Sequence, residues 1–446
     1  MKKRSAEKRY ALKRGVIAII FVSAFTLRAG AFDFNEDTYG SLADYLNGIY
    51  GESGIGNNGL TSFPILNIPM GGSSEAMASA YSAVANDISF IEFNPAGSSM
   101  LNHTELAFFH NNWIADTRLE SVLFATRYNN FGFAGGGKWL YTPFTEYNMY
   151  GERVSKGYYS EGVAVLNFSY NFLSSYYFSG ISAGLSVKGA FRIVPDYTDA
   201  DDRGAAEGHS NGTLIPGSGA SQSAAMAMAD IGFLTRFDFL KSFQSRDRNM
   251  AAALVVRNLG PPALGDPLPS VASAAISYKP LRPILLSFEF SVPFNMVDIN
   301  LSEPVYWSAG ISADIASFLS MRAGLLAKAG NIRIAIGSAI KLEKISLDIN
   351  YTLDLLTQFT PLNRISLGVR FNLGDQGRQE LNSRVEELYL AGLGAYAQEN
   401  FNEASSFWEE ALRLNPQFEP AREALASLKN SIRVRDRIED IQRIGF

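Results

Sequence analysis

Six basic residues fall on the inward face of alternating polar and apolar segments, and they are the strongest candidates for binding chemistry. They are Lys188, Arg192, Arg236, Arg322, Arg333 and Arg370. Lys and Arg pair strongly with carboxylates in a partly dry cavity, so such residues could attract the acidic group of a ligand. The alternative is a structural network with acidic residues on the same face, such as Glu289 and Asp348.

Catalytic chemistry has few residues to draw on. The histidines are His103, His110 and His209, and there is no Cys. A hydrolase triad or a metal site needs several converging groups. His110 beside Asn111 and Asn112, with Ser121 across a hairpin, is the best hydrolase arrangement, and a solvated His at a strand end is the alternative. We therefore predict no enzyme activity, no metal and no cofactor.

Two glycine patterns resemble nucleotide-binding motifs by letter only. Gly132 to Lys138 fits a P-loop until Trp139, where Ser or Thr should follow, and Gly54-x-Gly56-x-x-Gly59 lacks the preceding strand. Gly135, Gly136 and Gly137 have a better interpretation, because consecutive glycines weaken strand pairing and permit a bulge. A close approach of another segment to the wall is the alternative.

The start of the chain predicts export. Residues 1–14 are basic, Gly15 to Leu27 is apolar, and Ala29-Gly30-Ala31 is a small-residue cleavage site. This is the pattern of a secretory signal peptide over residues 1–31, since the apolar run is shorter than the roughly twenty residues of a spanning helix. The net charge of −5 makes a nucleic-acid partner unsuitable.

Residues 104–374 alternate as the strands of a β-barrel do. From Ile345 to Asp354 every second residue is apolar, and the segment starting at Arg364 repeats this. A barrel conceals its hydrophobicity in this way, whereas a soluble β-sandwich, the alternative, alternates too. A charge at Asp348 should then cost much less than one at Leu347.

About fourteen strands are expected in this region. Candidates are 104–110, 118–128, 130–142, 161–172, 179–194, 226–239, 250–260, 270–280, 284–295, 305–316, 318–328, 332–340, 345–354 and 364–373. Short turns should alternate with longer loops, of which 141–160 and 195–223 are the longest. An even strand count returns the chain to the side on which it began.

Residues 375–446, called the tail, change to a helical period. Helices are expected near 384–398 and 402–414, with a third from about 418, in a pattern that matches the tetratricopeptide template. Gly392, Ala404 and Ala411 would let the first two helices cross closely, Trp408 would fill the gap, and Pro416 would end the second. One and a half repeats should lean on the barrel rim, another subunit or a partner peptide.

Residues 32–103, called the hatch, have the small residues and turns of a plug. Small residues from Gly71 to Ala85 precede Asp87, and Phe93 leads into Asn94-Pro95-Ala96. Asp87 and Asn94-Pro95-Ala96 stand where FadL-type outer-membrane transporters of long-chain fatty acids carry their hatch motif, so the chain resembles that family. An uncharacterised group of FadL-like spirochaete outer-membrane proteins is most similar over residues 32–374. The tail departs from FadL-type transporters.

The resemblance implies a mainly β fold, a roughly 14-stranded antiparallel transmembrane β-barrel with an N-terminal hatch and a small C-terminal α-helical domain. It also implies passive uptake of fatty acids or other hydrophobic ligands across outer-membrane lipid, with the tail in the periplasm. Movement of the Asn94-Pro95-Ala96 region would release the ligand, and Gly135–Gly137 would allow a lateral opening. The alternative is a barrel that scaffolds periplasmic or secretion-linked proteins through its tail.

Overall fold

The computed structural model of the chain describes residues 61–113, 116–147, 150, 153–194, 223–245, 247–355 and 362–444. The predicted signal peptide, the first part of the hatch, the glycine pattern at 54–59 and most of the predicted loop 195–223 lie outside these residues.

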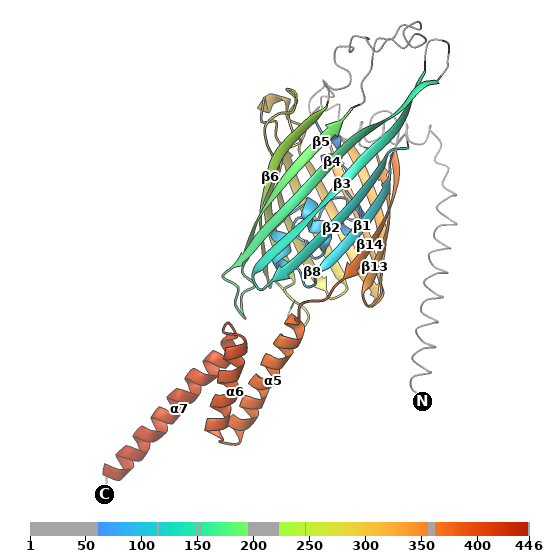
Figure 1. Ribbon diagram of the computed structural model, residues 1–446. Coiled ribbons are helices and arrows are strands. Elements are labelled where there is room, and N and C mark those ends of the chain that lie inside the picture. Colours follow the sequence, from blue (N-terminus) through green and yellow to red (C-terminus); the bar gives the residue numbers. More distant parts are fainter. Residues whose placement is uncertain are drawn as a thin grey trace, which may run out of the picture.

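The described residues form a closed antiparallel barrel of fourteen strands in which each strand pairs with its neighbours in sequence and β1 pairs with β14 (Figure 1). The strands are β1 (Glu105–Asn112), β2 (Arg118–Tyr128), β3 (Phe131–Tyr147), β4 (Arg153–Phe172), β5 (Ile181–Ile193), β6 (Ala224–Phe237), β7 (Met250–Leu259), β8 (Val271–Leu281), β9 (Ile284–Pro293), β10 (Tyr306–Ala316), β11 (Leu319–Lys328), β12 (Asn331–Lys341), β13 (Ile345–Asp354) and β14 (Leu362–Asn372). The predicted fold class is confirmed.

The alternation of side chains gives the barrel wall an apolar outer face and a polar inner face. On β13, Leu347 is 37% exposed, whereas Asp348 and Asn350 are 1% exposed. The outward residues of the other strands are also large and apolar, among them Phe124, Phe168, Phe233 and Phe288. No helix in the described part of the chain is long and apolar enough to cross a membrane.

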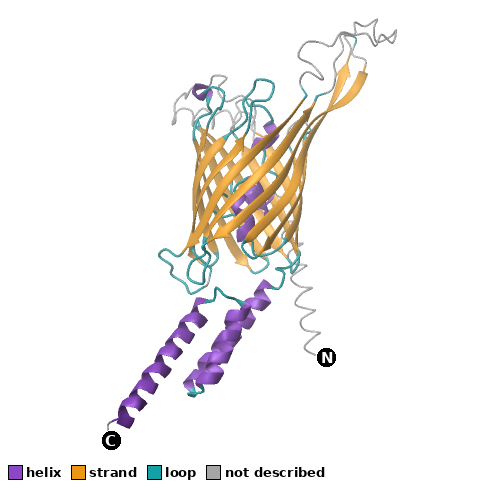
Figure 2. Cartoon of the chain, turned by 60° about the vertical axis from the view of Figure 1, so that its left-hand side comes forward, coloured by secondary structure: helices purple, strands orange, loops and turns teal. Residues whose placement is uncertain are grey.

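The loop predicted at 141–160 is wrong over most of its length. β3 and β4 continue through it as a paired hairpin that rises beyond the other strands (Figure 2). Their register shifts only between Glu146 and Tyr147 among the described pairs. Alternating aromatic and β-branched residues such as Tyr141, Thr142 and Tyr158 favour strand over loop.

The bulge predicted at Gly135–Gly137 is also absent. These glycines pair in continuous register with Val122–Phe124 on β2 and Ala164–Leu166 on β4. A Cβ at Gly137 would lie 2.8 Å from the carbonyl oxygen of Val163. The glycines therefore serve close packing within the wall, and a lateral opening here stays a prediction.

The described part of the hatch, residues 61–103, lies inside the barrel (Figure 2). Its helices are short: η1 (Pro64–Asn67), α3 (Gly72–Ala76), η2 (Ile88–Glu92) and η3 (Pro95–Met100). A short helix η5 (Ile299–Leu301) lies between β9 and β10. The hatch approaches the wall so closely that a Cβ at Gly184 would overlap the backbone of Pro95 and Ala96, and one at Gly324 would overlap that of Met77.

The tail forms three helices, α5 (Arg378–Ala397), α6 (Phe401–Leu414) and α7 (Glu419–Ile444). Trp408 is 2% exposed between α5 and α6, and any side chain at Gly392 would overlap its indole ring. Ala404 and Ala411 are buried beside it, and α6 ends at Leu414, just before Pro416. The predicted helices are confirmed, whereas their membership in the tetratricopeptide class stays a prediction.

The tail also contacts the barrel, as expected for so short a helical module. The ring of Phe418 lies 5.2 Å from that of Tyr176 in the β4–β5 turn, and the Tyr177 hydroxyl donates to Glu423 at 3.1 Å. We call this end of the barrel the tail end and the opposite end, where β3 and β4 protrude, the loop end (Figure 1).

Candidate functional site: the hatch and two lumen cavities

Wall cations bind three acidic residues in the described part of the hatch. Arg364 Nε lies 2.7 Å from Glu75 Oε1, and Arg370 Nη1 lies 2.5 Å from Asp87 Oδ2. The third pair, Lys138 Nζ and Glu92 Oε1, is 2.6 Å apart. All six side chains are largely buried. A buried charge is costly unless it is paired, so these contacts hold the hatch in one position.

Wall carboxylates in turn accept hydrogen bonds from hatch backbone amides. The amide of Ile88 donates to Glu105 at 2.8 Å, and that of Ile65 donates to Glu161 at 3.0 Å. Glu289 accepts from the amides of Ser82 at 3.0 Å and Tyr81 at 3.2 Å. The irregular hatch backbone thus finds in the wall the acceptors that regular structure would have supplied.

Asp87 and Asn94 fasten the hatch internally as well. Asp87 accepts from the amide of Ser89 at 3.0 Å and from the hydroxyl of Ser73 at 2.5 Å. Burial by itself raises the pKa of the Asp87 carboxyl, but the guanidinium groups of Arg370 and Arg322 outweigh it and hold this pKa below the usual range. The amide of Ala96 donates to Asn94 Oδ1 at 3.0 Å, and Asn94 Nδ2 donates to the Ser82 carbonyl at 2.8 Å.

Most of the six predicted basic residues have structural partners. Arg322 and Arg370 share Asp348, with contacts of 3.0 and 2.7 Å. Asp348 thus compensates two buried guanidinium groups, which is a structural argument against the predicted low cost of a positive charge at this position.

The other four are spread around the wall. Lys188 lies 2.6 Å from Asp230, and Arg333 lies 2.7 Å from Asp354. Arg236 donates hydrogen bonds to the backbone carbonyls of Val84 and Ala85. The guanidinium group of Arg192 lies over the ring of Phe63. The structural-network interpretation therefore accounts for most of this set, and the six do not form one ligand site.

One stretch of the hatch, Met77–Ala80, makes none of these ion pairs among the described residues, and we call it the gate segment. Ala78 and Ser79 have φ angles of 47° and 72°, a left-handed conformation that costs energy for residues other than glycine. Ala78 packs against Leu326 and Ala335 of the wall. The gate segment thus combines strained backbone with apolar packing against the wall.

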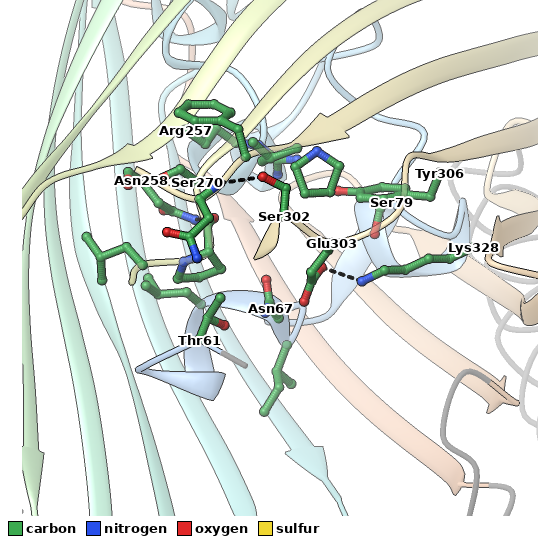
Figure 3. Close-up of a pocket in the computed structure, with 18 of the residues that line it drawn as sticks. Thr61, Asn67, Ser79, Arg257, Asn258, Ser270, Ser302, Glu303, Tyr306 and Lys328 are labelled. Atoms are coloured by element: carbon green, nitrogen blue, oxygen red, sulfur yellow. Dashed lines mark hydrogen bonds and ion pairs between the residues drawn. The ribbon is translucent and has the colours of Figure 1, made fainter. Parts of the chain in front are cut away.

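A cavity of about 160 Å³ lies on the loop-end side of the gate segment. Its lining mixes apolar residues such as Phe93, Leu268 and Phe294 with polar ones, including Ser79 of the gate segment. Figure 3 shows Arg257 from β7, Tyr306 from β10 and Lys328 from β11 around the same space. Its mixed lining suits an amphipathic molecule.

Arg257, which the sequence analysis did not select, is the distinctive residue of this cavity. Its guanidinium carbon lies 5.1 Å from the centre of the Phe93 ring, and Nη1 donates to the Glu92 carbonyl at 3.3 Å. Its Nε is buried without a hydrogen-bond partner among the described residues. Buried donors are rarely left unpaired, so this nitrogen is suited to a ligand acceptor. Arg257 could have been found from the sequence, because it follows the alternation of the inward-facing residues Ala251, Ala253 and Val255 on β7.

A second cavity of about 70 Å³ lies on the tail-end side of the hatch. Met77 of the gate segment, Val84 and Leu285 form its apolar wall, and Lys279 and Arg322 are among its charged residues. The gate segment therefore contributes residues to both cavities, with Ser79 in one and Met77 in the other.

The predicted hydrolase arrangement is not assembled. His110 pairs across the hairpin with Glu120, 2.7 Å from its Oε1, whereas Ser121 faces the interior and is 3% exposed. Neighbouring strand residues point to opposite faces, so His110 cannot reach Ser121. No group of acidic residues and histidines in the described part of the chain could hold a metal ion. Lys138 of the P-loop-like pattern lies in β3 and binds Glu92.

The fold and the hatch contacts define a closed, internally plugged β-barrel. Residues 52–376 match the model of an uncharacterised protein family, UPF0164, and the chain belongs to this family. A UPF0164 protein of Treponema pallidum (strain Nichols) is 27% identical over 409 residues, covering 87% of this chain and 88% of the relative. Another from the same strain is 23% identical over 403 residues, covering 84% of this chain and 77% of the relative.

Solved structures with a similar backbone include the CymD monoaromatic hydrocarbon channel, with a TM-score of 0.47 and 11% identity over 70% of this chain and 99% of that one. The Pseudomonas putida toluene transporter TodX has a TM-score of 0.41 and 10% identity over 70% of this chain and 97% of that one. Neither similarity assigns a ligand to this chain.

Proposed function

We propose that the protein is an outer-membrane channel for passive uptake of small amphipathic or hydrophobic molecules, with long-chain fatty acids as the ligands that the hatch motif suggests. The observation that carries this proposal is the position of the gate segment. It contributes residues to a cavity on each side of the hatch, and it is not held by the buried ion pairs that fix the hatch elsewhere in its described part.

A ligand would enter from the loop end and place its polar group on Arg257, while its apolar part contacts residues such as Phe93 and Leu268. Displacement of Met77–Ala80 would then join the two cavities. The Asn94-Pro95-Ala96 region is the less suitable moving part, because the Asn94 side chain is hydrogen-bonded to both hatch and wall.

The exterior of the barrel supports the membrane part of the proposal. Outward apolar residues such as Phe168, Ile231 and Phe288 are 42–51% exposed around the wall. A monomer in water rarely exposes so continuous an apolar surface. Trp139 and Tyr158 lie toward the loop end of this surface and Tyr128 toward the tail end, which suits the aromatic girdles of a barrel in a bilayer.

The cost of an arginine on this outer surface should depend on the depth of the substituted position in the bilayer. Leu367→Arg, near the middle of β14, should cost about 2–4 kcal/mol of folding free energy in a bilayer, whereas Leu373→Arg at the tail end should cost about 0–1 kcal/mol. Unfolding in lipid vesicles, followed by the gel shift between boiled and unboiled samples, measures both. Equal losses at the two positions would contradict the proposed membrane depth.

Fatty-acid uptake tests the channel directly. A host without its own transporter should accumulate radiolabelled dodecanoate when it expresses the protein, with surface expression checked for each variant. Because the chain has no Cys, Ser79→Cys provides a single thiol at the gate segment. A bulky thiol reagent should abolish uptake by this variant and leave the parent unaffected. Parent uptake no higher than that of an empty vector would overturn the proposal.

Docking of a periplasmic protein through the tail is the second candidate. Leu390 and Leu393 of α5 are 63% and 39% exposed on a module that is itself fixed to the barrel rim. Copurifying partners should then be lost when residues 376–446 are deleted, with dodecanoate uptake at the empty-vector level in both forms. Uptake that survives the deletion would favour the channel.

A further inference from the structure

The cavity at the tail end carries a surplus of positive charge. Its described lining includes four basic residues and one acidic residue: Lys279, Arg282, Arg322, Lys341 and Asp314. The chain as a whole has a net charge of −5, so this local excess is opposite to its average.

Two of these cations are available to a ligand. Lys341 lies 2.9 Å from Asp314, and Arg322 lies 3.0 Å from Asp348 on the neighbouring wall. Arg282 donates to the backbone carbonyl of Gln244, and no carboxylate among the described residues pairs with it or with Lys279. Lys and Arg bind carboxylate and phosphate oxygens through charge-assisted hydrogen bonds.

The size and shape of the cavity restrict the ligand group further. Its volume of about 70 Å³ holds roughly two water molecules. This is room for a carboxylate or a phosphate group, whereas most of an alkyl chain would extend beyond it. Hydroxyl-bearing Ser73 and Ser312 also line the space, while Met77 and Val84 form its apolar side.

We propose that this cavity is a second binding site, which takes a compact oxyanionic group: the carboxylate of an amphiphile or a free phosphate-like ion. The assignment to an amphiphile rests on the proposed channel. An acidic group released from Arg257 would meet Lys279 and Arg282 once the gate segment moves, so the ligand passes with its anionic group leading. Met77 and Leu285 would then contact the first part of its apolar chain.

Acetylation of lysines in the purified full-length protein tests the site without any transport. Dodecanoate, inorganic phosphate and neutral methyl dodecanoate are added separately, and mass spectrometry follows the rate at Lys279. Lys344 in the β12–β13 turn is the internal control, because it is exposed at the same rim and does not line the cavity. We expect several-fold slower acetylation of Lys279 with dodecanoate or phosphate, and no change at Lys344.

The added compounds distinguish the sources of the oxyanion. Slowing by phosphate alone supports a site for a free ion, and slowing by dodecanoate alone supports a site for the head of an amphiphile. Equal slowing by methyl dodecanoate, or no slowing by any compound, would overturn the proposal.

Variants then connect the site to uptake. Lys279→Gln combined with Arg282→Gln should lower dodecanoate uptake at least about tenfold, because two charge-assisted hydrogen bonds are lost, whereas Lys344→Gln should not change it. Parent uptake at the empty-vector level would remove the channel and leave the acetylation result to decide the oxyanion site. Normal uptake by the double variant, with surface expression equal to that of the parent, would overturn the role of this site in passage.

Discussion

Glu75→Ala is expected to unseat the hatch and to cost about 3–5 kcal/mol, because it leaves a buried guanidinium group without its partner. Arg364 is 3% exposed and Glu75 is 1% exposed, so water cannot replace the lost carboxylate. Ser366 and Thr352 lose their acceptor in the same substitution. Denaturant unfolding in micelles measures the loss, and chymotrypsin should cut the hatch at Tyr81 and Phe90, which the parent conceals.

The double substitution Glu75→Met with Arg364→Met separates charge from shape. Replacing both members of a buried ion pair by apolar residues is often nearly neutral, so most of the stability should return. Glu120→Gln is the matched control, because its pair with His110 is about two-fifths exposed and should contribute less than about 1 kcal/mol. A parent-like Glu75→Ala protein would show that this ion pair does not hold the hatch.

Trp408→Ala is expected to unfold the helices of the tail while the barrel stays folded. Truncating a buried aromatic side chain costs roughly 3–5 kcal/mol, and so small a core has little stability in reserve. Trp408 is enclosed by Gly392, Ala404 and Ala411, and its Nε1 donates to the Tyr389 carbonyl at 3.2 Å.

Limited proteolysis measures this effect, with the gel shift on boiling as the test of the barrel. Residues 376–446 should be degraded in the variant and largely protected in the parent. Leu390→Ala is the control, because Leu390 is 63% exposed on the neighbouring helix α5 and its loss should be nearly neutral. A protease-resistant tail in Trp408→Ala would contradict the packing described for α5 and α6.

The strands could be predicted because each carries its own signal. On β13 and β14, outward-facing and lumen-facing residues alternate without interruption, so Leu347 and Asp348 reveal their faces without reference to the rest of the chain. The tail helices were predictable for the same reason, since Gly392 and Trp408 lie close together in the sequence. The ends of β3 and β4 were missed because these two strands extend beyond the length of the other strands.

The hatch contacts could not be predicted in this way. Glu75 meets Arg364 across 289 residues, and neither position is distinguished by its neighbours in sequence. The hatch has no regular periodicity, so the sequence does not indicate which of its acidic side chains point toward the barrel wall. The cavities are harder still, because their linings combine residues of the hatch, several strands and the connecting loops.

The last strand has a consequence for how the protein is made. β14 closes the cylinder by pairing with β1, and it also supplies Arg364 and Arg370, which hold Glu75 and Asp87 from 289 and 283 residues away. Sealing of the wall and seating of the plug therefore depend on the same late-synthesised segment. A chain cut short before Leu362 would have an open edge and a hatch without two of its three ion pairs to the wall. Such an incomplete chain should be recognisable by the strand edge that it still exposes.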